Sequence, residues 1–182
     1  MMEEKVITAA LEEIERRGLK FTMDDITKRL HISKTSLYKM VPSKDALIHG
    51  VIQYQMDESR TQEKRILSET VGAEPKLRAL VRSCIQLFGF MGDIHDDLRF
   101  SYEKEWEIWE AFRKEKIAVM ISLIQLGAEE GVFRPVNAAL VQTCLIAAVA
   151  AVSDTRFLRE HHLAYEDAID DILDVVLHGI KK

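Results

Sequence analysis

Three hydroxyl side chains, Thr22, Ser33 and Ser43, stand at the starts of helical stretches and divide the first fifty residues into short segments. Serine and threonine are favoured N-cap residues, because the side-chain oxygen accepts a hydrogen bond from an otherwise unpaired backbone N–H of the first turn. Asp25 follows Thr22 by three residues, which is a weak variant of the capping box. The spacing therefore predicts three closely spaced helix starts, with only short helices between them.

Helical periodicity continues through the remainder of the chain. Glycine and proline are scarce, with 8 and 3 residues among 182, and apolar side chains recur at three- and four-residue spacing. Gly18 is expected to end the first helix, and Gly89 and Gly92 are expected to end a later one. We therefore predict an all-α protein with about nine helices. The expected helices span residues 3–17, 22–30, 34–40, 44–68, 75–88, 98–130, 137–160 and 165–180, with an acidic connection or short helix at 93–97.

The breaks near the N-terminus form a known motif. Three short helices precede a long one, and a tight turn at residues 31–33 separates the second from the third, which is the helix-turn-helix pattern. In that motif the second helix of the pair enters the major groove of DNA with its N-terminal residues first. We therefore predict a helix-turn-helix DNA-binding domain over residues 1–48. A larger helical effector-binding and dimerisation domain is expected over residues 49–182.

The charge distribution favours a polyanion as the partner of the first domain. The chain has a net charge of -5, yet residues 26–44 contain no carboxylate. Lysine can pair with guanine O6 and N7 or with phosphate, and threonine can contact a thymine methyl group. The cations of this stretch are Lys28, Arg29, Lys34, Lys39 and Lys44. The expected exposed positions of the reading helix are Lys34, Thr35, Ser36, Tyr38 and Lys39, whereas Leu37 faces inward.

Residues 6–52 resemble the DNA-binding domain of the TetR family of transcriptional regulators. In that family a first helix ending in Gly is followed by an aromatic residue and Thr, an Ile, a turn, S-x-x-x-L-Y, a spacer and S-K-x-x-L. The matching residues are Gly18, Phe21, Thr22, Ile26, Ser33, Leu37, Tyr38, Ser43, Lys44 and Leu47. The resemblance implies backbone phosphate contacts from Thr22, Ser33, Tyr38 and Lys44, and base or phosphate contacts from Lys34, Thr35, Ser36 and Lys39.

Two residues depart from the family pattern. His31 stands where the turn usually has glycine, and a non-glycine residue at positive φ costs about 1 kcal/mol, although histidine is among the more tolerant types. Val41 stands where an aromatic residue is usual. We expect Val41 to thin the packing between the third and fourth helices without removing a DNA contact.

Beyond the first 50 or so residues the resemblance concerns architecture only. It implies five or six further helices, of which the last two form a dimer interface, and the Ala-rich helix at 137–160 would allow another helix to approach closely. The helical domain of such proteins often encloses a small-molecule effector. The candidate effector-binding residues are Cys84, Phe88, Tyr102, Trp106, Trp109, Met120 and Leu123, with ordinary core packing as the alternative for each.

These features predict a ligand-responsive transcriptional regulator, a repressor by family resemblance, that binds a pseudo-palindromic double-stranded DNA operator as a homodimer. A helical enzyme and a protein-binding scaffold with an appended helix-turn-helix are the alternatives. The sequence lacks H-E-x-x-H, C-x-x-C, E-x-x-H and Walker motifs, so we expect no catalytic residue, metal site or cofactor. No apolar run approaches the roughly 20 residues of a membrane span, and we expect a cytoplasmic protein without a membrane partner. Cys84 and Cys144 are expected to be buried free thiols.

Overall fold

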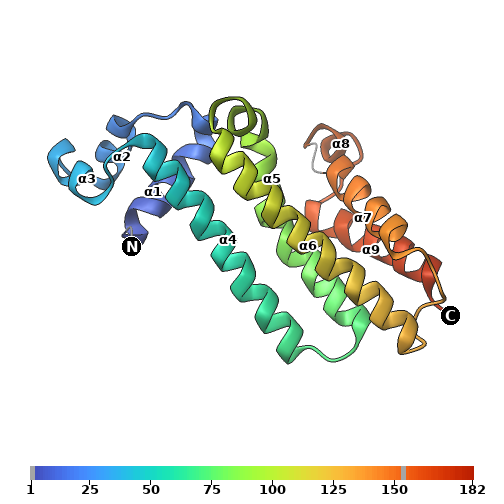
Figure 1. Ribbon diagram of the computed structural model, residues 1–182. Coiled ribbons are helices and arrows are strands. Elements are labelled where there is room, and N and C mark those ends of the chain that lie inside the picture. Colours follow the sequence, from blue (N-terminus) through green and yellow to red (C-terminus); the bar gives the residue numbers. More distant parts are fainter. Residues whose placement is uncertain (1–2, 153–154) are drawn as a thin grey trace. The chain divides into compact units, whose positions relative to one another are not determined.

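A computed structural model describes residues 3–152 and 155–182, and the side chains of residues 85–93 and 155–157 are outside the described part. Every regular element in the described residues is a helix, which confirms the all-α prediction (Figure 1). The elements are α1 (Glu4–Arg17), the 3-10 turn η1 (Gly18–Lys20), α2 (Met23–Leu30), α3 (Lys34–Met40), α4 (Lys44–Glu69), α5 (Ala73–Ser101), α6 (Glu103–Glu129), α7 (Ala138–Val152), α8 (Thr155–Glu160) and α9 (Tyr165–Ile180).

The chain forms two compact units. The first unit consists of Met1–Thr61 and Gln86–Phe112, and the second consists of Gln62–Ile85 and Arg113–Lys182. The three long helices α4, α5 and α6 therefore each contribute residues to both units. The expected boundary between residues 48 and 49 concerns DNA binding and effector binding, and it stays a prediction.

The first unit is built around apolar side chains from its short helices. Phe21, Ile26 and Leu37 are completely buried in one continuous core. Trp109 and Phe112 of α6 belong to the same core and stack with 5.8 Å between their ring centroids. Because each short helix buries one apolar face here, the opposite faces of these helices remain available to solvent.

The hydroxyl caps predicted from the sequence are confirmed. Thr22 Oγ1 accepts the Asp25 backbone N–H at 3.3 Å, and the Asp25 carboxylate accepts the Thr22 backbone N–H at 2.8 Å, so both halves of the capping box form. The hydrogen bonds from Thr22 hold the pKa of the Asp25 carboxyl below its ordinary value. Ser33 Oγ accepts the Ser36 N–H at 3.1 Å, and Ser43 Oγ accepts a backbone N–H in the first turn of α4 at 3.1 Å.

The helix expected to end at Gly89 and Gly92 does not end there. α5 continues through both glycines to Ser101, and the acidic stretch that follows them is helical as well. A glycine inside a helix costs about 1 kcal/mol relative to alanine. Ile94 and Leu98, on the following turns, are almost completely buried, and burial of two such side chains contributes more than the glycines cost.

The helix expected over residues 137–160 is described as two elements. Asn137 Oδ1 accepts the Leu140 N–H at 3.1 Å and caps α7, and the described part of α7 extends to Val152. α8 begins at Thr155, and the two residues between these helices lie outside the described part of the chain.

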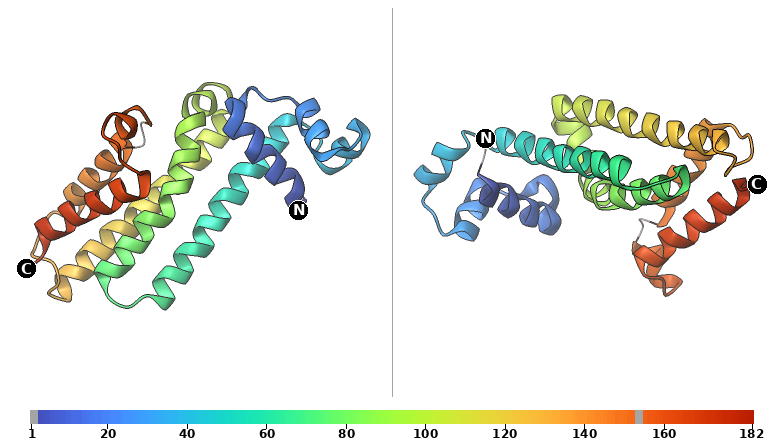
Figure 2. Two further views of the ribbon diagram at one scale, coloured as in Figure 1. Left: turned by 180° about the vertical axis from the view of Figure 1, so that it is seen from behind. Right: turned by 90° about the horizontal axis from the view of Figure 1, so that it is seen from below.

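In the second unit, α7 and α9 lie side by side (Figures 1 and 2). Two ion pairs attach α9 to α5, with Arg78 Nη1 2.7 Å from Asp174 Oδ1 and Arg82 Nη2 2.6 Å from Asp170 Oδ1. Within the described residues, none of the helices has the length and apolar character that crossing a bilayer requires.

The two cysteines differ in environment. Cys84 is a buried free thiol, as expected, and burial raises the pKa of that thiol to about 11. The prediction that Cys144 is buried is wrong for the single chain, because its free thiol is exposed. Cys144 lies on the side of α7 that faces away from the buried residues Leu145 and Val149, so an apolar neighbourhood in the sequence did not imply burial.

Candidate nucleic-acid interface

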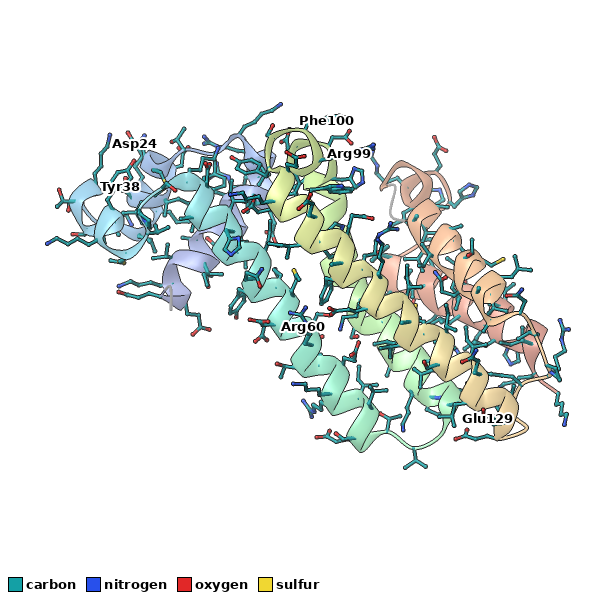
Figure 3. The ribbon with its side chains drawn as sticks, in the orientation of Figure 1. Asp24, Tyr38, Arg60, Arg99, Phe100 and Glu129 are labelled. Carbon is teal, nitrogen blue, oxygen red and sulfur yellow. The ribbon has the colours of Figure 1, made fainter. Side chains whose placement is uncertain are left out.

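α3 is a short helix held by one inward side chain. Leu37 is completely buried in the core of the first unit, whereas the next residue, Tyr38, is 48% exposed (Figure 3). Ser36 is half-buried and shares a hydrogen bond of 2.9 Å with the Ser33 hydroxyl. The side of α3 opposite Leu37 is called the α3 surface here, and it consists of Lys34, Thr35, Ser36, Tyr38 and Lys39. Leu37 is buried and Lys34, Thr35, Tyr38 and Lys39 are exposed, as expected from the sequence, whereas Ser36, also expected to be exposed, is half-buried.

The turn before α3 has the geometry of a helix-turn-helix. His31 adopts the left-handed conformation, with φ 54° and ψ 41°, and its backbone N–H bonds to carbonyl oxygens of Lys28 and Thr27. The sequence-based expectation of a non-glycine residue at positive φ is confirmed. Val41, the other departure from the family pattern, is completely buried.

Folding changes the charge pattern of residues 26–44. Lys34 Nζ lies 2.8 Å from Asp24 Oδ1, and Arg29 is paired with acids of α1. An acid-free stretch of sequence is therefore not an acid-free surface, because carboxylates from outside the stretch fold against it. Among the described residues, Lys28, Lys39 and Lys44 form no ion pair with a carboxylate. These three lysines carry the uncompensated charge that remains.

Arg29 holds α1 and α2 together. Its Nε donates to Glu13 Oε1 at 2.9 Å, and its other nitrogens reach Glu13 and Glu12. The Glu13 side chain is only 3% exposed, and the hydrogen bond from Arg29 holds the pKa of its carboxyl below the ordinary value, against the effect of burial. Arg29 thus belongs to the framework of the unit rather than to the α3 surface.

Lys44 also has an internal role. Its ammonium donates to the backbone carbonyl of Leu19 and lies 4.8 Å from the centroid of the Phe21 ring. These contacts fix the first turn of α4 to the segment between α1 and α2. The phosphate contact expected of Lys44 stays a prediction, and any such contact would share the ammonium with the Leu19 carbonyl.

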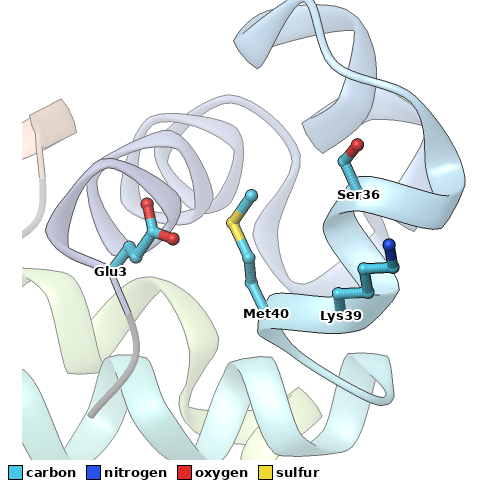
Figure 4. A pocket seen from close by; sticks show the side chains of 4 residues that line it. All are labelled: Glu3, Ser36, Lys39 and Met40. Carbon is cyan, nitrogen blue, oxygen red and sulfur yellow. The ribbon is translucent and has the colours of Figure 1, made fainter.

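A shallow hollow borders the end of the α3 surface. It is lined by Glu3, Ser36, Lys39 and Met40, and Figure 4 shows these side chains on α3 and on the residue that precedes α1. Glu3 is itself paired with Lys5 at 2.8 Å. The hollow extends the polar face that α3 presents beyond the helix itself.

Comparison with known proteins places this geometry in a family. The family model for bacterial regulatory proteins of the tetR family matches residues 6–51, which include α2, α3 and most of α1. Residues 6–51 form a TetR-family DNA-binding domain. The protein is accordingly a DNA-binding regulator of transcription and not an enzyme.

Full-length comparisons find a similar transcriptional regulator and solved structures with the same fold. The chain is 25% identical over 182 residues to the uncharacterized HTH-type transcriptional regulator YvaF of Bacillus subtilis (strain 168). The aligned region covers 98% of this chain and 95% of YvaF. The structure of a TetR-family regulator from Agrobacterium tumefaciens superposes with a TM-score of 0.81 at 15% identity, covering 98% and 97% of the two chains. The structure of AibR in complex with isovaleryl coenzyme A and operator DNA gives 0.67 at 19% identity, covering 93% and 95%. These two structural matches show the fold alone.

The candidate effector residues are distributed over both units. Cys84, Met120 and Leu123 are buried in the second unit. In the first unit, Trp109 is buried, and Tyr102 and Trp106 are half-buried. The side chain of Phe88 lies outside the described residues. Their common role in binding an effector stays a prediction.

The sequence did not predict two lysine–carboxylate pairs, Lys34 with Asp24 and Lys116 with Glu63. Asp24 reaches Lys34 across the turn, and no short-range spacing rule connects residues on two different helices. Lys116 is 1% exposed and lies 2.8 Å from Glu63, although its sequence neighbourhood is as charged as that of a surface residue. The burial of Lys116 could have been inferred from the sequence, because apolar residues stand four positions before and after it. These residues, Phe112 and Met120, are buried one turn away on the same face of the helix.

Proposed function

We propose that the protein binds a pseudo-palindromic duplex operator as a homodimer through the α3 surface and represses transcription until a small molecule weakens that binding. The single observation that supports DNA contact by α3 is the exposure of Tyr38 and Lys39 on a helix anchored from behind by Leu37. In a helix-turn-helix, such side chains reach base edges or phosphates in the major groove. Two-fold symmetry would place the half-sites about one helical turn apart, roughly 34 Å.

The DNA-contact proposal is tested with duplexes selected from a random pool. We expect the enriched sequence to have two-fold symmetry, and we expect Tyr38→Ala to weaken its binding. Lys39→Ala should weaken binding and reduce the slope of log K against log salt by about 0.9 for each phosphate contact that it removes. Electrophoretic mobility shifts over a series of salt concentrations measure both quantities.

Lys104→Ala is the matched control, because Lys104 is an exposed lysine of α6 in the same unit but not on α3. This variant should leave the affinity and the salt slope close to those of the wild type. Unchanged binding by both Tyr38→Ala and Lys39→Ala would contradict the proposed role of α3. Selection that enriches no sequence would instead favour the alternative of a protein-binding scaffold.

The proposed homodimer is supported by the composition of α7. This helix contains no charged residue, and a helix that is apolar on all sides is normally covered on all sides. Leu140 is nevertheless 63% exposed, and Val175 on the adjacent helix α9 is 75% exposed. The other exposed residues of α7 are small and recur at three- and four-residue spacing, namely Ala139, Thr143, Cys144, Ala147, Ala150 and Ala151. A second copy of the same surface, related by two-fold symmetry, would cover them.

Leu140→Lys is expected to convert the dimer into a monomer, because a lysine at each of the two symmetric positions would place unpaired charge in an apolar contact. Val71→Lys is the control, since Val71 is 88% exposed in the connection between α4 and α5. Sedimentation equilibrium should give monomer for the first variant and dimer for the second. The Cys144 thiol should react faster with a thiol reagent in the Leu140→Lys variant than in the wild type. A dimeric Leu140→Lys protein would exclude α7 from the interface.

The effector is proposed to bind among buried residues of the second unit. Cys84, Met120 and Leu123 supply the largely apolar lining that small-molecule sites require. AibR, which shares the fold, was solved with isovaleryl coenzyme A and operator DNA together. An effector that binds the DNA-incompetent arrangement more tightly would weaken operator binding by that difference in affinity and no more.

A further inference from the structure

The ion pair between Asp24 and Lys34 lies at the edge of the α3 surface. Asp24 is in the first turn of α2, Lys34 is the first residue of α3, and their side chains are 49% and 65% exposed. The hydrogen bond to Asp24 raises the pKa of the Lys34 ammonium above its ordinary value, and Tyr38 acts in the same direction. Figure 3 shows Asp24 and Tyr38 at the same end of the first unit. A carboxylate therefore occupies a place where a DNA phosphate would otherwise meet Lys34.

The stability of the fold gives little reason for this pair. An exposed ion pair contributes little to stability, because water and salt screen the attraction between its charges. A carboxylate at a helix N-terminus is also favourable, but α2 already has the Asp25 carboxylate and a complete capping box with Thr22. The larger consequence of Asp24 falls on DNA binding, because Asp24 neutralises a cation of the surface that would contact the polyanion.

We propose that Asp24 is a specificity-determining residue, which holds the Lys34 ammonium on non-operator DNA and releases it when α3 docks on the operator. The inference rests on the proposed function, since it requires the α3 surface to face DNA. Docked α3 side chains bring base edges and phosphates to Lys34 in a fixed position, and these acceptors replace the carboxylate. On a non-operator duplex α3 does not seat in this way, and Lys34 keeps its partner Asp24.

If Asp24 acts in this way, affinity for the operator and affinity for other DNA should depend differently on salt concentration. Non-specific affinity comes almost entirely from counterion release, and each phosphate contact contributes about 0.9 to the slope of log K against log salt. A lysine already paired with an aspartate adds no such contact. Asp24 therefore lowers affinity for the many non-operator sites in a genome, whereas the operator complex keeps the contribution of Lys34.

Asp24→Asn is the decisive variant, tested on the duplex enriched by selection and on a scrambled duplex of the same length. On the scrambled duplex we expect the salt slope to steepen by about 0.9 for each bound protomer, which corresponds to about eightfold tighter binding per protomer at 0.1 M monovalent salt. On the selected duplex we expect an unchanged slope. The affinity there should rise less than about fivefold per protomer, the limit set by loss of an exposed ion pair in the free protein.

Lys34→Met gives an independent measurement with the opposite pattern. It should leave the slope on the scrambled duplex unchanged, because the paired lysine contributes nothing there, and it should reduce the slope on the selected duplex by about 0.9 per protomer. Asp45→Asn is the control for net charge. Asp45 is the second residue of α4, as Asp24 is of α2, and it should leave both slopes unchanged.

Two results would overturn the inference. Equal changes on both duplexes in the Asp24→Asn protein would mean that Asp24 repels DNA without discriminating between sequences. No change on either duplex, together with equal effects of Lys34→Met on both, would mean that Asp24 does not restrain Lys34. Failure of the proposed function itself is recognised separately, because Tyr38→Ala and Lys39→Ala would then also leave binding unchanged.

Discussion

Replacing Lys116 by alanine is expected to lower the free energy of unfolding by about 3–5 kcal/mol, the range for removing one partner of a buried ion pair. Lys116 is 1% exposed, and its ammonium lies 2.8 Å from a carboxylate oxygen of Glu63, whose side chain is 17% exposed. The variant would leave Glu63 without this partner in a largely dry environment. It would also remove the aliphatic stem of the lysine from the packing of the second unit. Urea denaturation followed by circular dichroism measures the loss.

A double variant that lacks both charges separates two contributions to the free energy of unfolding. One is the cost of leaving the Glu63 carboxylate unpaired, and the other is the stabilisation that the ion pair itself provides. In the Glu63→Gln, Lys116→Met double variant, both charges are removed while the volumes are nearly kept, and we expect a loss below about 1.5 kcal/mol. The Lys116→Met single variant should fall between the double variant and Lys116→Ala. Equal losses in all three proteins would show that Glu63 does not depend on Lys116 for its stability in the folded state.

Lys116 and Glu63 also show where sequence reasoning reaches its limit. The starts of α2, α3 and α4 could be predicted because each of these helices carries its own start signal, and the hydrogen bonds of Thr22, Ser33 and Ser43 confirm these signals. Such caps act within one turn of the chain and need no tertiary information. A pair between α4 and α6 depends on how two helices meet, and no local pattern contains that information.

Two predictions were wrong for the same physical reason, namely the helix end at Gly89 and Gly92 and the burial of Cys144. Gly89 and Gly92 are weak helix breakers, and the burial of residues farther along α5 decides whether the helix continues. Cys144 lies in an uncharged segment, and its exposure in the single chain depends on which face of α7 packs against α9. Propensity and composition cannot specify either outcome, because both are set by contacts between elements distant in sequence.

The candidate DNA-binding surface was predictable in its residues but not in its charge. Leu37 and Tyr38 occupy the inward and outward positions that the spacing indicated. The absence of acids from residues 26–44 favoured a polyanion as the partner, which stays a prediction, but it gave no indication that Asp24 folds onto Lys34 and compensates its charge. Counting charges along the chain treats neighbours in sequence as neighbours in space, which holds within a helix but not across a turn.

Gly127→Ala is expected to lower the free energy of unfolding by about 1–3 kcal/mol, although alanine is normally the better helix former. Gly127 is near the end of α6, and a methyl group there would overlap the ring of Phe133, which is completely buried. The ring cannot move away easily, because the Phe133 N–H donates to the Gly127 carbonyl at 2.9 Å and the Arg134 N–H donates to the Ile180 carbonyl at 2.8 Å. Thermal unfolding followed by circular dichroism detects the loss as a lower Tm.

Gly179→Ala is the matched control, because a methyl group on this α9 glycine meets no atom within 4 Å. Without an overlap, the helix preference of alanine should raise the stability by up to about 1 kcal/mol. The overlap itself is tested by combining Gly127→Ala with Phe133→Leu, since the smaller side chain leaves room for the methyl group. We expect Gly127→Ala to cost clearly less in the Phe133→Leu background than in the wild type, because neighbouring substitutions couple when they share one contact. An equal cost in both backgrounds would place the origin of the effect in the backbone of α6 instead of in the Phe133 ring.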